Sequence, residues 1–499
     1  MMFAQTTLAT PDVSWLAIAP EITLGLGAAI VLLVEVQFLP PIRRLGALVG
    51  GILAVAFGFS VWQWIRVDEL LTTTDSAEFL AGFLPFGEMI VMDHGSVLAR
   101  FALLTVAALG IVSGWQLFER LGRRGAEALA LVLLATSGFT LMASSVHLMM
   151  MFLGLEVGSI ALYILAGITR DRISSDEAAI KYFLLGSVAS AVFVYGVALV
   201  FAATGELSLL DARSFLSGTI VTRPAVLLIG MAMLVVGLGF KISAAPFHSW
   251  APDVYQGAPA GIVGYMAAAA KIGGFAALIR VLHTAFPSLL AEWAPLIAGI
   301  ATLSMVGGGI LALVQDDVRR LLAYSGVTHA GFILMGMVGG GVGAPEIWFY
   351  LAVYTLQLVG AFGVVAVVAG ATGGPTPIAA FRGLGRTQPM LAVAFGVLLL
   401  GMGGLPLTSG FVAKFGVFQT AWQAGFEWLV VVAVLASVVG FAFYLRVIVA
   451  MYMHDEADDA VPAPTMPSRT VVALTAIVTV VLGLLPAPLL ELTARAIPL

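Results

Sequence analysis

Long apolar runs separated by short polar loops repeat along almost the whole chain of 499 residues. A helix needs about 20 mostly apolar residues to cross the hydrocarbon core of a bilayer. The pattern therefore predicts an all-α polytopic membrane protein with about fourteen transmembrane helices. The predicted spans are 14–36, 44–65, 96–118, 126–145, 147–168, 178–203, 224–244, 259–283, 293–314, 321–341, 346–370, 389–423, 427–453 and 470–491.

Two of these spans contain helix breakers. The seventh runs into SAAPFHSWAPD at 243–253, and the twelfth contains GGLPLTSG at 403–410 and is too long for one simple helix. Helix breaks at membrane depth persist only where the freed backbone groups are buried in protein or line a wet cavity. The two breaks therefore predict an internal polar path.

The two broken spans also indicate an internal repeat. Laying spans 4–8 over spans 9–13 brings the breaks into register and places Lys241 on Lys414, although Lys241 precedes its proline and Lys414 follows its proline. Each unit has an odd number of crossings, so the two five-helix copies must be inverted in the membrane, as in many transporters. The predicted parts are helices 1–3 at 1–125, the first repeat at 126–283, the second repeat at 293–453, and a cytoplasmic linker with helix 14 at 454–499.

Composition and charge agree with a chain surrounded by lipid. Apolar residues make up 61% of the sequence and charged residues 10%, whereas a soluble protein has about a quarter of its residues charged. The net charge of −5 argues against a nucleic-acid partner. The absence of cysteine excludes disulfides and thiolate ligation of zinc or iron–sulfur clusters by this chain.

Basic residues set the orientation of the spans. Outside the buried positions, fourteen basic residues fall on one side of the predicted membrane and five on the other. The positive-inside rule places the richer side in the cytoplasm and both termini outside. The acidic loop 66–95 suits the outer face, and the acidic, proline-containing segment 454–468 is expected to be an exposed cytoplasmic linker.

Ionisable side chains within the spans are few. A charge at the centre of a spanning helix costs about 2.5–3.5 kcal/mol on insertion scales, so it has to be paired, hydrated or used. Glu156 lies near the middle of the fifth span, Lys271 lies inside the eighth, and Lys241 and Lys414 adjoin the two breaks. Three of only four lysines in the chain are thus among these groups.

The choice of lysine has a chemical interpretation. An arginine stays protonated, whereas desolvation disfavours the charged form of a lysine, which can then lose its proton. A nearby carboxylate favours the charged amine, so moving or neutralising that carboxylate would release the proton. This chemistry favours a proton path through Glu156 and the three lysines. Ion pairs that only fix helix packing are the alternative.

Three further residues are weaker candidates for a proton relay. Lys181, near the cytoplasmic end of the sixth span, either reaches the interface or lies close to Glu156. His329 in the tenth span could bridge the lysines, since histidine titrates near neutrality, or could be a hydrogen-bonded core residue. His248, just after Pro246, could serve the cytoplasmic entrance or a helix end. The sequence leaves these alternatives open.

One string is distinctive enough to indicate a family. GFKISAAPFHSWAPDVYQGAPA at 239–260 resembles the characteristic motif of the antiporter-like subunits of proton-pumping NADH:quinone oxidoreductase, respiratory complex I. The strings DEAAIKYFLLGS at 176–187 and RLLAYSGVTHAGF at 320–332 are similar to further motifs of these subunits. The resemblance covers nearly the whole chain. It implies a pair of inverted five-helix bundles with flanking helices.

The resemblance also implies roles for the matching residues. Glu156 and Lys241 would be a charge-switching pair, Lys271 a central relay and Lys414 the terminal lysine of the channel. One branch of the family carries a glutamate where Lys414 stands, and another carries a long lateral helix after the last span. Neither feature is present here.

In this family the chain itself performs no redox chemistry and holds no cofactor. The resemblance implies a translocase subunit in a bacterial inner membrane, next to antiporter-like subunit M and small membrane subunits. NADH, FMN, iron–sulfur clusters and quinone would lie in partner subunits, where electron transfer would drive proton movement here. A subunit of an Mrp-type cation/proton antiporter is the alternative, and a complex with another electron donor also fits the sequence.

Overall fold

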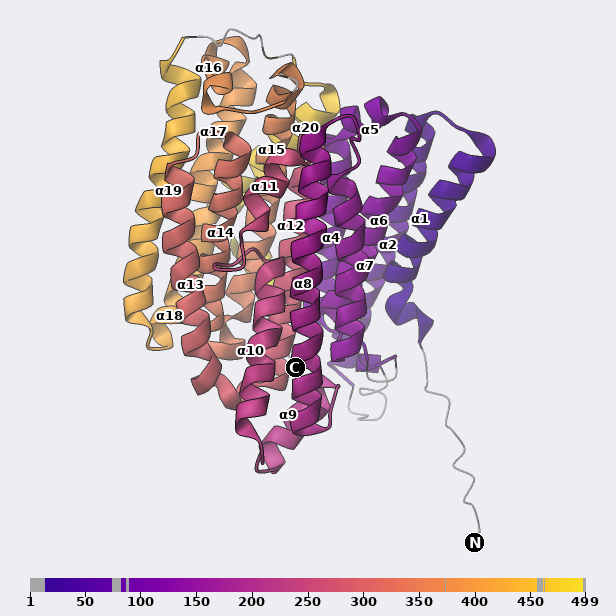
Figure 1. Cartoon of the computed structure of the whole chain (residues 1–499), viewed down its shortest axis with the longest axis vertical. Helices are drawn as coiled ribbons and strands as arrows, with labels where there is room; N and C mark the ends of the chain where they lie inside the picture. Colours follow the sequence, from indigo (N-terminus) through magenta and orange to yellow (C-terminus); the bar gives the residue numbers. More distant parts are fainter. Residues whose placement is uncertain are drawn as a thin grey trace.

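The computed structural model describes residues 14–73, 82–86, 89–372, 374–455, 461 and 463–496. Within these ranges every regular element is a helix, as the sequence predicts. The helices stand side by side as a tall bundle (Figure 1). Parts of the acidic loop 66–95 and of the linker 454–468 lie outside the described residues.

The elements fall into the order that the sequence predicts. The N-terminal elements are η1 (Trp15–Ile18), α1 (Ala19–Phe38), α2 (Ile42–Leu70), α4 (His94–Ser113) and α5 (Trp115–Leu121). The next are α6 (Arg123–Ser144), α7 (Leu148–Ala166), α8 (Ile173–Thr204), α9 (Leu209–Gly218), α10 (Pro224–Lys241), α11 (Trp250–Gly257), α12 (Ala260–Ile279) and the π-helix η2 (Arg280–Ala285).

The second half of the chain continues in the same way. Its elements are η3 (Pro287–Leu289), α13 (Leu290–Leu313), α14 (Val318–Met337), η4 (Gly340–Gly343), α15 (Ala344–Thr372), η5 (Ile378–Phe381), α16 (Leu384–Thr387), α17 (Pro389–Gly403), α18 (Ser409–Gln423) and α19 (Glu427–Met453). The last two are α20 (Met466–Leu484) and α21 (Ala487–Ala494).

The number of crossings agrees with the sequence. Twelve described helical stretches are long and apolar enough to cross a membrane. The more polar α14 and the pair α17–α18 add two, which makes the predicted fourteen. Two predicted spans were too long. The third breaks at Gly114 between α4 and α5, and the last breaks at Pro486 between α20 and α21.

Both predicted helix breaks are present. The first separates α10 from α11, and Ser243 within it has a φ of 60°. The second separates α17 from α18, with φ values of 87° at Gly404 and 70° at Leu407. Figure 1 shows α11 above α10 but α17 above α18, so the two broken helices run in opposite directions. Inverted repeats require this arrangement.

Both described ends of the chain lie at the same end of the bundle. Ser14 donates its backbone N–H to the carbonyl of Pro85, and Arg495 forms an ion pair with Asp68 at 3.2 Å, at the end of α2. The helices α5 and α16 lie at the opposite end (Figure 1). The predicted placement of both termini on one side therefore fits the arrangement of the helices.

A buried ion pair joins two segments at the end of the bundle that holds the termini. Asp93 is the N-cap of α4, and Arg280 in the π-helix η2 donates to both of its carboxylate oxygens. Burial by itself would raise the pKa of the Asp93 carboxyl, but the charge and hydrogen bonds of Arg280 hold that pKa below its usual value. This pair therefore fastens α4 to the end of α12.

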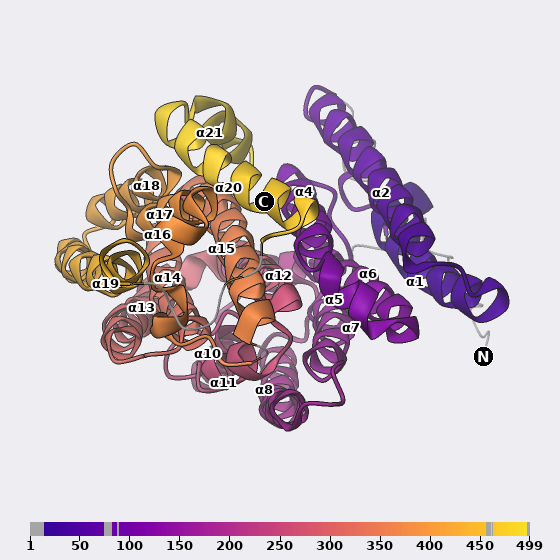
Figure 2. The same ribbon diagram turned by 90° about the horizontal axis from the view of Figure 1, so that it is seen from above.

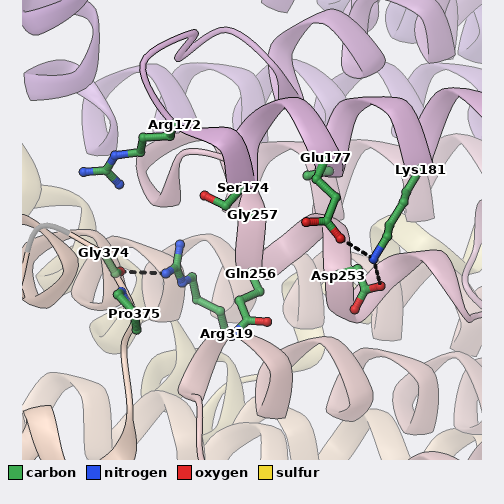
Figure 3. Close-up of a pocket in the computed structure, with 11 residues that line it drawn as sticks. Arg172, Ser174, Glu177, Lys181, Asp253, Gln256, Gly257, Arg319, Gly374 and Pro375 are labelled. Atoms are coloured by element: carbon green, nitrogen blue, oxygen red, sulfur yellow. Dashed lines mark hydrogen bonds and ion pairs between the residues drawn. The ribbon is translucent and has the colours of Figure 1, made fainter.

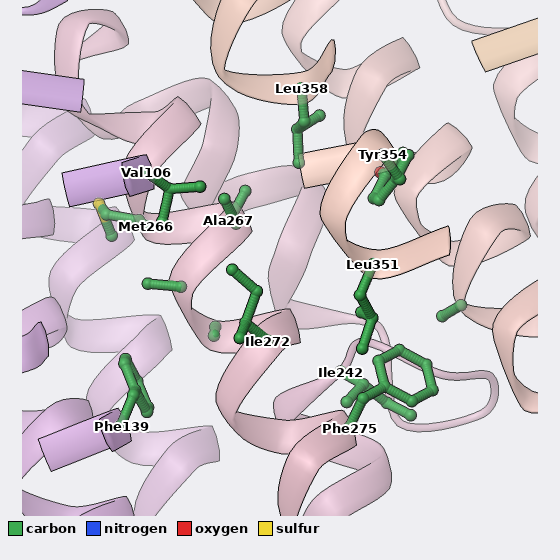
Figure 4. Packing of buried hydrophobic residues seen from close by; sticks show 14 of the residues in the cluster. Val106, Phe139, Ile242, Met266, Ala267, Ile272, Phe275, Leu351, Tyr354 and Leu358 are labelled. Atoms are coloured by element: carbon green, nitrogen blue, oxygen red, sulfur yellow. The ribbon is translucent and has the colours of Figure 1, made fainter. Parts of the chain in front are cut away.

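Helix α12 forms the centre of the bundle. Every residue from Ile262 to Ile279 is buried, because α4, α6, α10 and α15 all pack against this helix. Figure 2 shows α12 inside the ring of other helices, and Figure 4 shows Ile272 and Phe275 among apolar side chains from its neighbours. A charge on α12 therefore has to be solvated by the protein itself.

The packing of α6 against α7 depends on glycine. A Cβ atom on Gly138 would lie 2.3 Å from the backbone nitrogen of Gly158 and 2.8 Å from the carbonyl oxygen of Gly154. Glu156 lies between these two glycines of α7. The close approach of the two backbones therefore fixes the position of Glu156 in the bundle.

We expect Gly138→Val to destabilise the protein, because a side chain here must push α6 and α7 apart. Overpacking of this kind costs typically about 1–3 kcal/mol. The measurement is the melting temperature of the detergent-solubilised protein. The matched control is Gly51→Val, since a Cβ at Gly51 would meet nothing within 4 Å. Equal melting temperatures for the two variants would contradict this account of the α6–α7 contact.

Candidate functional site

Glu156 and Lys241 lie near each other, but each is hydrogen-bonded to a different serine. The carboxylate of Glu156, which is half-buried on α7, accepts a hydrogen bond from the hydroxyl of Ser190 on α8. Lys241 ends α10, and its Nζ donates to Oγ of Ser159 at 2.8 Å, one turn after Glu156. The carboxylate is near enough to act electrostatically on the amine. A change of charge at Glu156 would therefore be felt at Lys241.

Aromatic rings surround the rest of the Lys241 amine. Its Nζ lies 5.1 Å from the ring centre of Phe139, 5.8 Å from that of Tyr163 and 5.5 Å from that of Tyr182. The faces of aromatic rings attract a cation within about 6 Å. The charged amine is thus stabilised in a position where only 2% of the residue is exposed.

Lys271 uses backbone released by the first helix break. Its Nζ donates to the carbonyl oxygen of Ile242 at 2.7 Å and to that of Gly326 on α14 at 2.9 Å. Ile242 directly follows Lys241 and is the C-cap of α10. The carbonyls at the end of a helix lack intrahelical partners and carry partial negative charge, so they suit an ammonium group.

Lys414 uses the second break in a similar way. Its Nζ donates to the carbonyl oxygen of Gly403, the last residue of α17, at 2.8 Å and lies 4.6 Å from the ring centre of Phe332. A cavity of about 340 Å³ adjoins the amine, and its lining includes four phenylalanines, among them Phe411 and Phe415. Lys414 therefore has free space beside it as well as a backbone acceptor.

His329 lies near both of these lysines, among three tyrosines. Its Nδ1 is 2.8 Å from the hydroxyl of Tyr350, its Nε2 is 3.2 Å from that of Tyr444, and its ring stacks on Tyr354 with 4.2 Å between ring centres. Lys271 and Lys414 are both near enough to act on it electrostatically. Both open alternatives for His329 therefore fit, since it is hydrogen-bonded in the core and lies near both lysines.

Tyr354 brings this histidine close to Lys271. A Cβ atom on Gly326 would lie 3.3 Å from the Tyr354 hydroxyl and 3.7 Å from Nζ of Lys271, so the two groups converge on one glycine. The Tyr354 hydroxyl is buried without a hydrogen-bond partner among the described residues. We call Glu156, Lys241, Lys271, His329 and Lys414 the buried row.

Lys181 lies outside the buried row. Its Nζ forms ion pairs with Glu177 at 2.7 Å and with Asp253 on α11 at 2.8 Å, and Asp253 also binds Arg320 at 2.6 Å. These groups surround a polar pocket of about 430 Å³ (Figure 3), and 42% of the Lys181 side chain is exposed. The structure thus favours the interfacial alternative for Lys181, since the partner of Glu156 is Ser190.

His248 lies in the loop between α10, which ends in Lys241, and α11, which carries Asp253. It is half-buried, its ring centre lies 6.1 Å from that of Tyr324, and its Nδ1 has no partner within the part of the chain described here. In the sequence, His248 therefore stands between Lys241 of the buried row and Asp253 of the polar pocket. No hydrogen bond between described residues joins it to either.

The sequence did not identify the neutral partners of the charged groups. Ser159, Ser190 and the tyrosines around His329 hold the buried row in place, yet serine and tyrosine are ordinary residues in apolar helices. The one available signal was the spacing of Tyr350 and Tyr354, which puts both on one face of α15. Among the described residues, no group of three or more His, Cys, Asp or Glu could hold a metal ion.

Comparison with known sequences identifies relatives over most of the chain. Residues 145–440 match the family model described as NADH:quinone oxidoreductase/Mrp antiporter, TM. A Mycobacterium bovis protein named NADH-quinone oxidoreductase subunit N is 45% identical over 386 residues, which is 76% of this chain and 72% of the relative. A Chloroflexus aggregans protein of the same name is 36% identical over 499 residues, covering 98% of this chain and 99% of the relative.

Solved structures share the fold. A chain of respiratory complex I from Thermus thermophilus with bound aureothin is 33% identical with a TM-score of 0.76, covering 95% of this chain and 98% of that one. A chain of an archaeal membrane-bound sulfane sulfur reductase has 25% identity and a TM-score of 0.83, covering 96% and 97%. A chain of the Mrp complex from a Dietzia species, 20% identical with a TM-score of 0.82, covers 97% of both and shares the fold.

The polar pocket yields a prediction about stability. Asp253→Asn removes the carboxylate shared by Lys181 and Arg320, and we expect a loss of about 1 kcal/mol because the group is only partly buried. The melting temperature in detergent should fall, and the difference from the unmodified protein should shrink at high salt, which screens partly exposed charges. The control is Glu177→Gln, which breaks a single ion pair whose carboxylate is more exposed than that of Asp253. A loss at Glu177 as large as that at Asp253 would contradict the shared role of Asp253.

Proposed function

This chain belongs to the NADH:quinone oxidoreductase/Mrp antiporter family of membrane proteins, and we propose that it is a proton-translocating membrane subunit of an NADH:quinone oxidoreductase. Its relatives at 36% and 45% identity are named subunit N of that enzyme. The strings DVYQGAPA, DEAAIKYFLLGS and RLLAYSGVTHAGF favour the same subunit, the counterpart of mitochondrial NADH dehydrogenase subunit 2. Lys414 favours it over subunit M, which carries a glutamate at this position.

The observation that supports this proposal most is the set of partners of the buried amines. Lys241 donates to a serine hydroxyl, and Lys271 and Lys414 donate to backbone carbonyls. A lysine that loses its proton beside such neutral partners leaves no unpaired carboxylate in the core, whereas breaking a buried ion pair leaves an uncompensated charge. The amines can therefore change protonation state at moderate cost.

In this mechanism the charge of Glu156 controls the protonation state of Lys241. While its carboxylate is charged, it favours a protonated Lys241. When Glu156 is neutralised, or its charge moves away, Lys241 releases its proton towards the next acceptor. The amine of Lys271 binds the backbone carbonyl of Ile242, the residue directly after Lys241. Lys271 is therefore the next amine in the row.

His329 and its tyrosines carry the path onward to Lys414. An imidazole can donate from one nitrogen and accept at the other, and a tyrosine hydroxyl can also do both. Tyr354 faces Lys271 across Gly326, and His329 stacks on Tyr354. We assign His329 the role of a relay between Lys271 and Lys414, with water filling the remaining gaps. The polar pocket around Lys181, followed by His248, would supply protons to the row from the cytoplasmic side.

The proposal assigns electron transfer to partner subunits. NADH, FMN, iron–sulfur clusters and quinone would be bound there, and subunit M and small membrane subunits would be the neighbours of this chain. The chain would lie in a bacterial inner membrane with both termini on the periplasmic side. Charge changes passed along the membrane subunits would set the charge at Glu156.

A second function has one observation in its favour. The fold matches a chain of an Mrp complex with a TM-score of 0.82, and the same lysines could serve cation/proton antiport. Sodium efflux by the purified chain in proteoliposomes would support this alternative. Copurification with a redox complex in mild detergent, without sodium efflux, would support the proton-translocating subunit.

We expect Glu156→Gln and Lys241→Met each to reduce coupled proton translocation at least tenfold, because each removes one half of the switching pair. The measurement is proton uptake per NADH oxidised by the intact complex in proteoliposomes. Arg223→Gln is the control, since Arg223 is an exposed residue at the start of the helix that ends in Lys241. Normal proton uptake by both variants would refute the mechanism.

The same Lys241→Met variant separates transport from a purely structural role. The Lys241 amine donates to a neutral hydroxyl and forms no direct ion pair, so an apolar side chain of similar volume removes a desolvated charge without leaving a bonded carboxylate unpaired. The assembled complex should therefore melt no lower than the unmodified one. A clear drop in melting temperature with proton uptake intact would favour the structural alternative.

Lys414→Arg tests whether this position must release a proton. The cavity of about 340 Å³ beside Lys414 gives room for a guanidinium, which stays protonated. We expect assembly and melting temperature to be retained and proton uptake per NADH to fall at least fivefold. Retained uptake would show that position 414 needs only a positive charge.

A further inference from the structure

An apolar groove runs between α17 and α20 on the outside of the bundle. Its volume is about 700 Å³, and its walls include Val393 and Val397 from α17 and Ala473, Ile477 and Val481 from α20. The two helices pack directly against each other, and Figure 2 shows α20 at the margin of the bundle beside α15 and α17. The small side chain of Ala473 leaves the hollow between the larger ones.

The groove opens towards the bilayer. Val393 is 52% exposed and Ile477 is 60% exposed, although both lie within membrane-crossing helices. Their exposed surface is apolar, so at this depth it contacts hydrocarbon. The long axis of the groove follows the two helices, which suits an extended acyl chain.

One end of the groove is polar and positively charged. Gln388 and Arg469 line it at the end where α17 and α20 both begin. Arg469 is exposed, and Arg386, which pairs with Asp455 at 3.3 Å, lies two residues before Gln388. By the positive-inside distribution this is the cytoplasmic boundary of the membrane, where phospholipid headgroups lie.

We propose that this groove is a binding site for an anionic glycerophospholipid, with an acyl chain between α17 and α20 and the phosphate held by Arg469. A guanidinium binds phosphate through paired, charge-assisted hydrogen bonds. The volume lies within the roughly 300–1,000 Å³ typical of sites for single small molecules. The apolar walls and the guanidinium at one end match the two parts of a phospholipid, its acyl chain and its anionic headgroup.

The experiment uses the intact complex in mild detergent and a phosphatidylglycerol with a photoreactive group on its acyl chain. Peptides from α17 and α20 should be labelled, and unlabelled phosphatidylglycerol should compete at least threefold better than phosphatidylcholine. Ala473→Phe, which fills the groove, should reduce labelling of these peptides at least fivefold. Arg469→Gln should remove the preference for phosphatidylglycerol and leave acyl-chain labelling in place.

Two variants provide matched controls. Leu435→Phe enlarges another lipid-facing side chain, which is 63% exposed on α19, and Arg44→Gln removes an exposed arginine at the start of α2. Both should label as the unmodified complex does. Ala394→Phe, on the opposite wall of the groove, should repeat the effect of Ala473→Phe and exclude a local folding defect.

Three outcomes would overturn the proposal. Undiminished labelling in both groove-filling variants would show that lipid does not occupy the groove. Equal competition by phosphatidylcholine and phosphatidylglycerol would show that Arg469 does not select an anionic headgroup. Crosslinks from the groove to a helix of another subunit, with no lipid labelling, would identify a protein occupant.

Discussion

Inside a bilayer every backbone polar group must find its partner within the protein, because no water is available to it. The two breaks in the membrane helices violate continuous helical bonding and release carbonyls at the ends of α10 and α17. Lys271 and Lys414 donate to these ends, at Ile242 and Gly403. Each amine satisfies a carbonyl that the break exposes, and each carbonyl solvates an amine that lipid could not. The breaks and the buried lysines are therefore one structural solution.

This solution differs from an ordinary ion pair. Lys181 forms two ion pairs with carboxylates and is partly exposed, so its charge is fixed by its partners. The lysines of the buried row have neutral acceptors and aromatic faces instead. Such partners stabilise an ammonium group but tolerate its neutral form, because they carry no net charge of their own. The separation between fixed and variable charges thus follows from the identity of the hydrogen-bond acceptors.

Much of this arrangement was predictable from the sequence, and there is a physical reason why the rest was not. The apolar runs predicted fourteen crossings and both breaks, because a spanning helix requires a fixed length of apolar residues. The rarity of buried charges identified Glu156 and the three lysines. The hydrogen-bond partners of these groups could not be predicted from the sequence, since Ser190 contacts Glu156 only because α8 packs on α7. Helix ends at Gly114 and Pro486 were missed because apolar residues continue across them.

The imperfect match between the two halves has an explanation in the same contacts. Sequence alignment pairs Lys241 with Lys414, although one precedes its break and the other follows it. In space, the feature that both halves share is an amine at the C-terminal end of a half-helix, supplied by Lys271 from α12 in one half and by Lys414 from α18 in the other. Lys241 is then free to donate to Ser159 near Glu156, whereas Lys414 donates to the backbone and faces the ring of Phe332. In the proposed mechanism the first half carries the charge switch, and the second ends the row beside an open cavity.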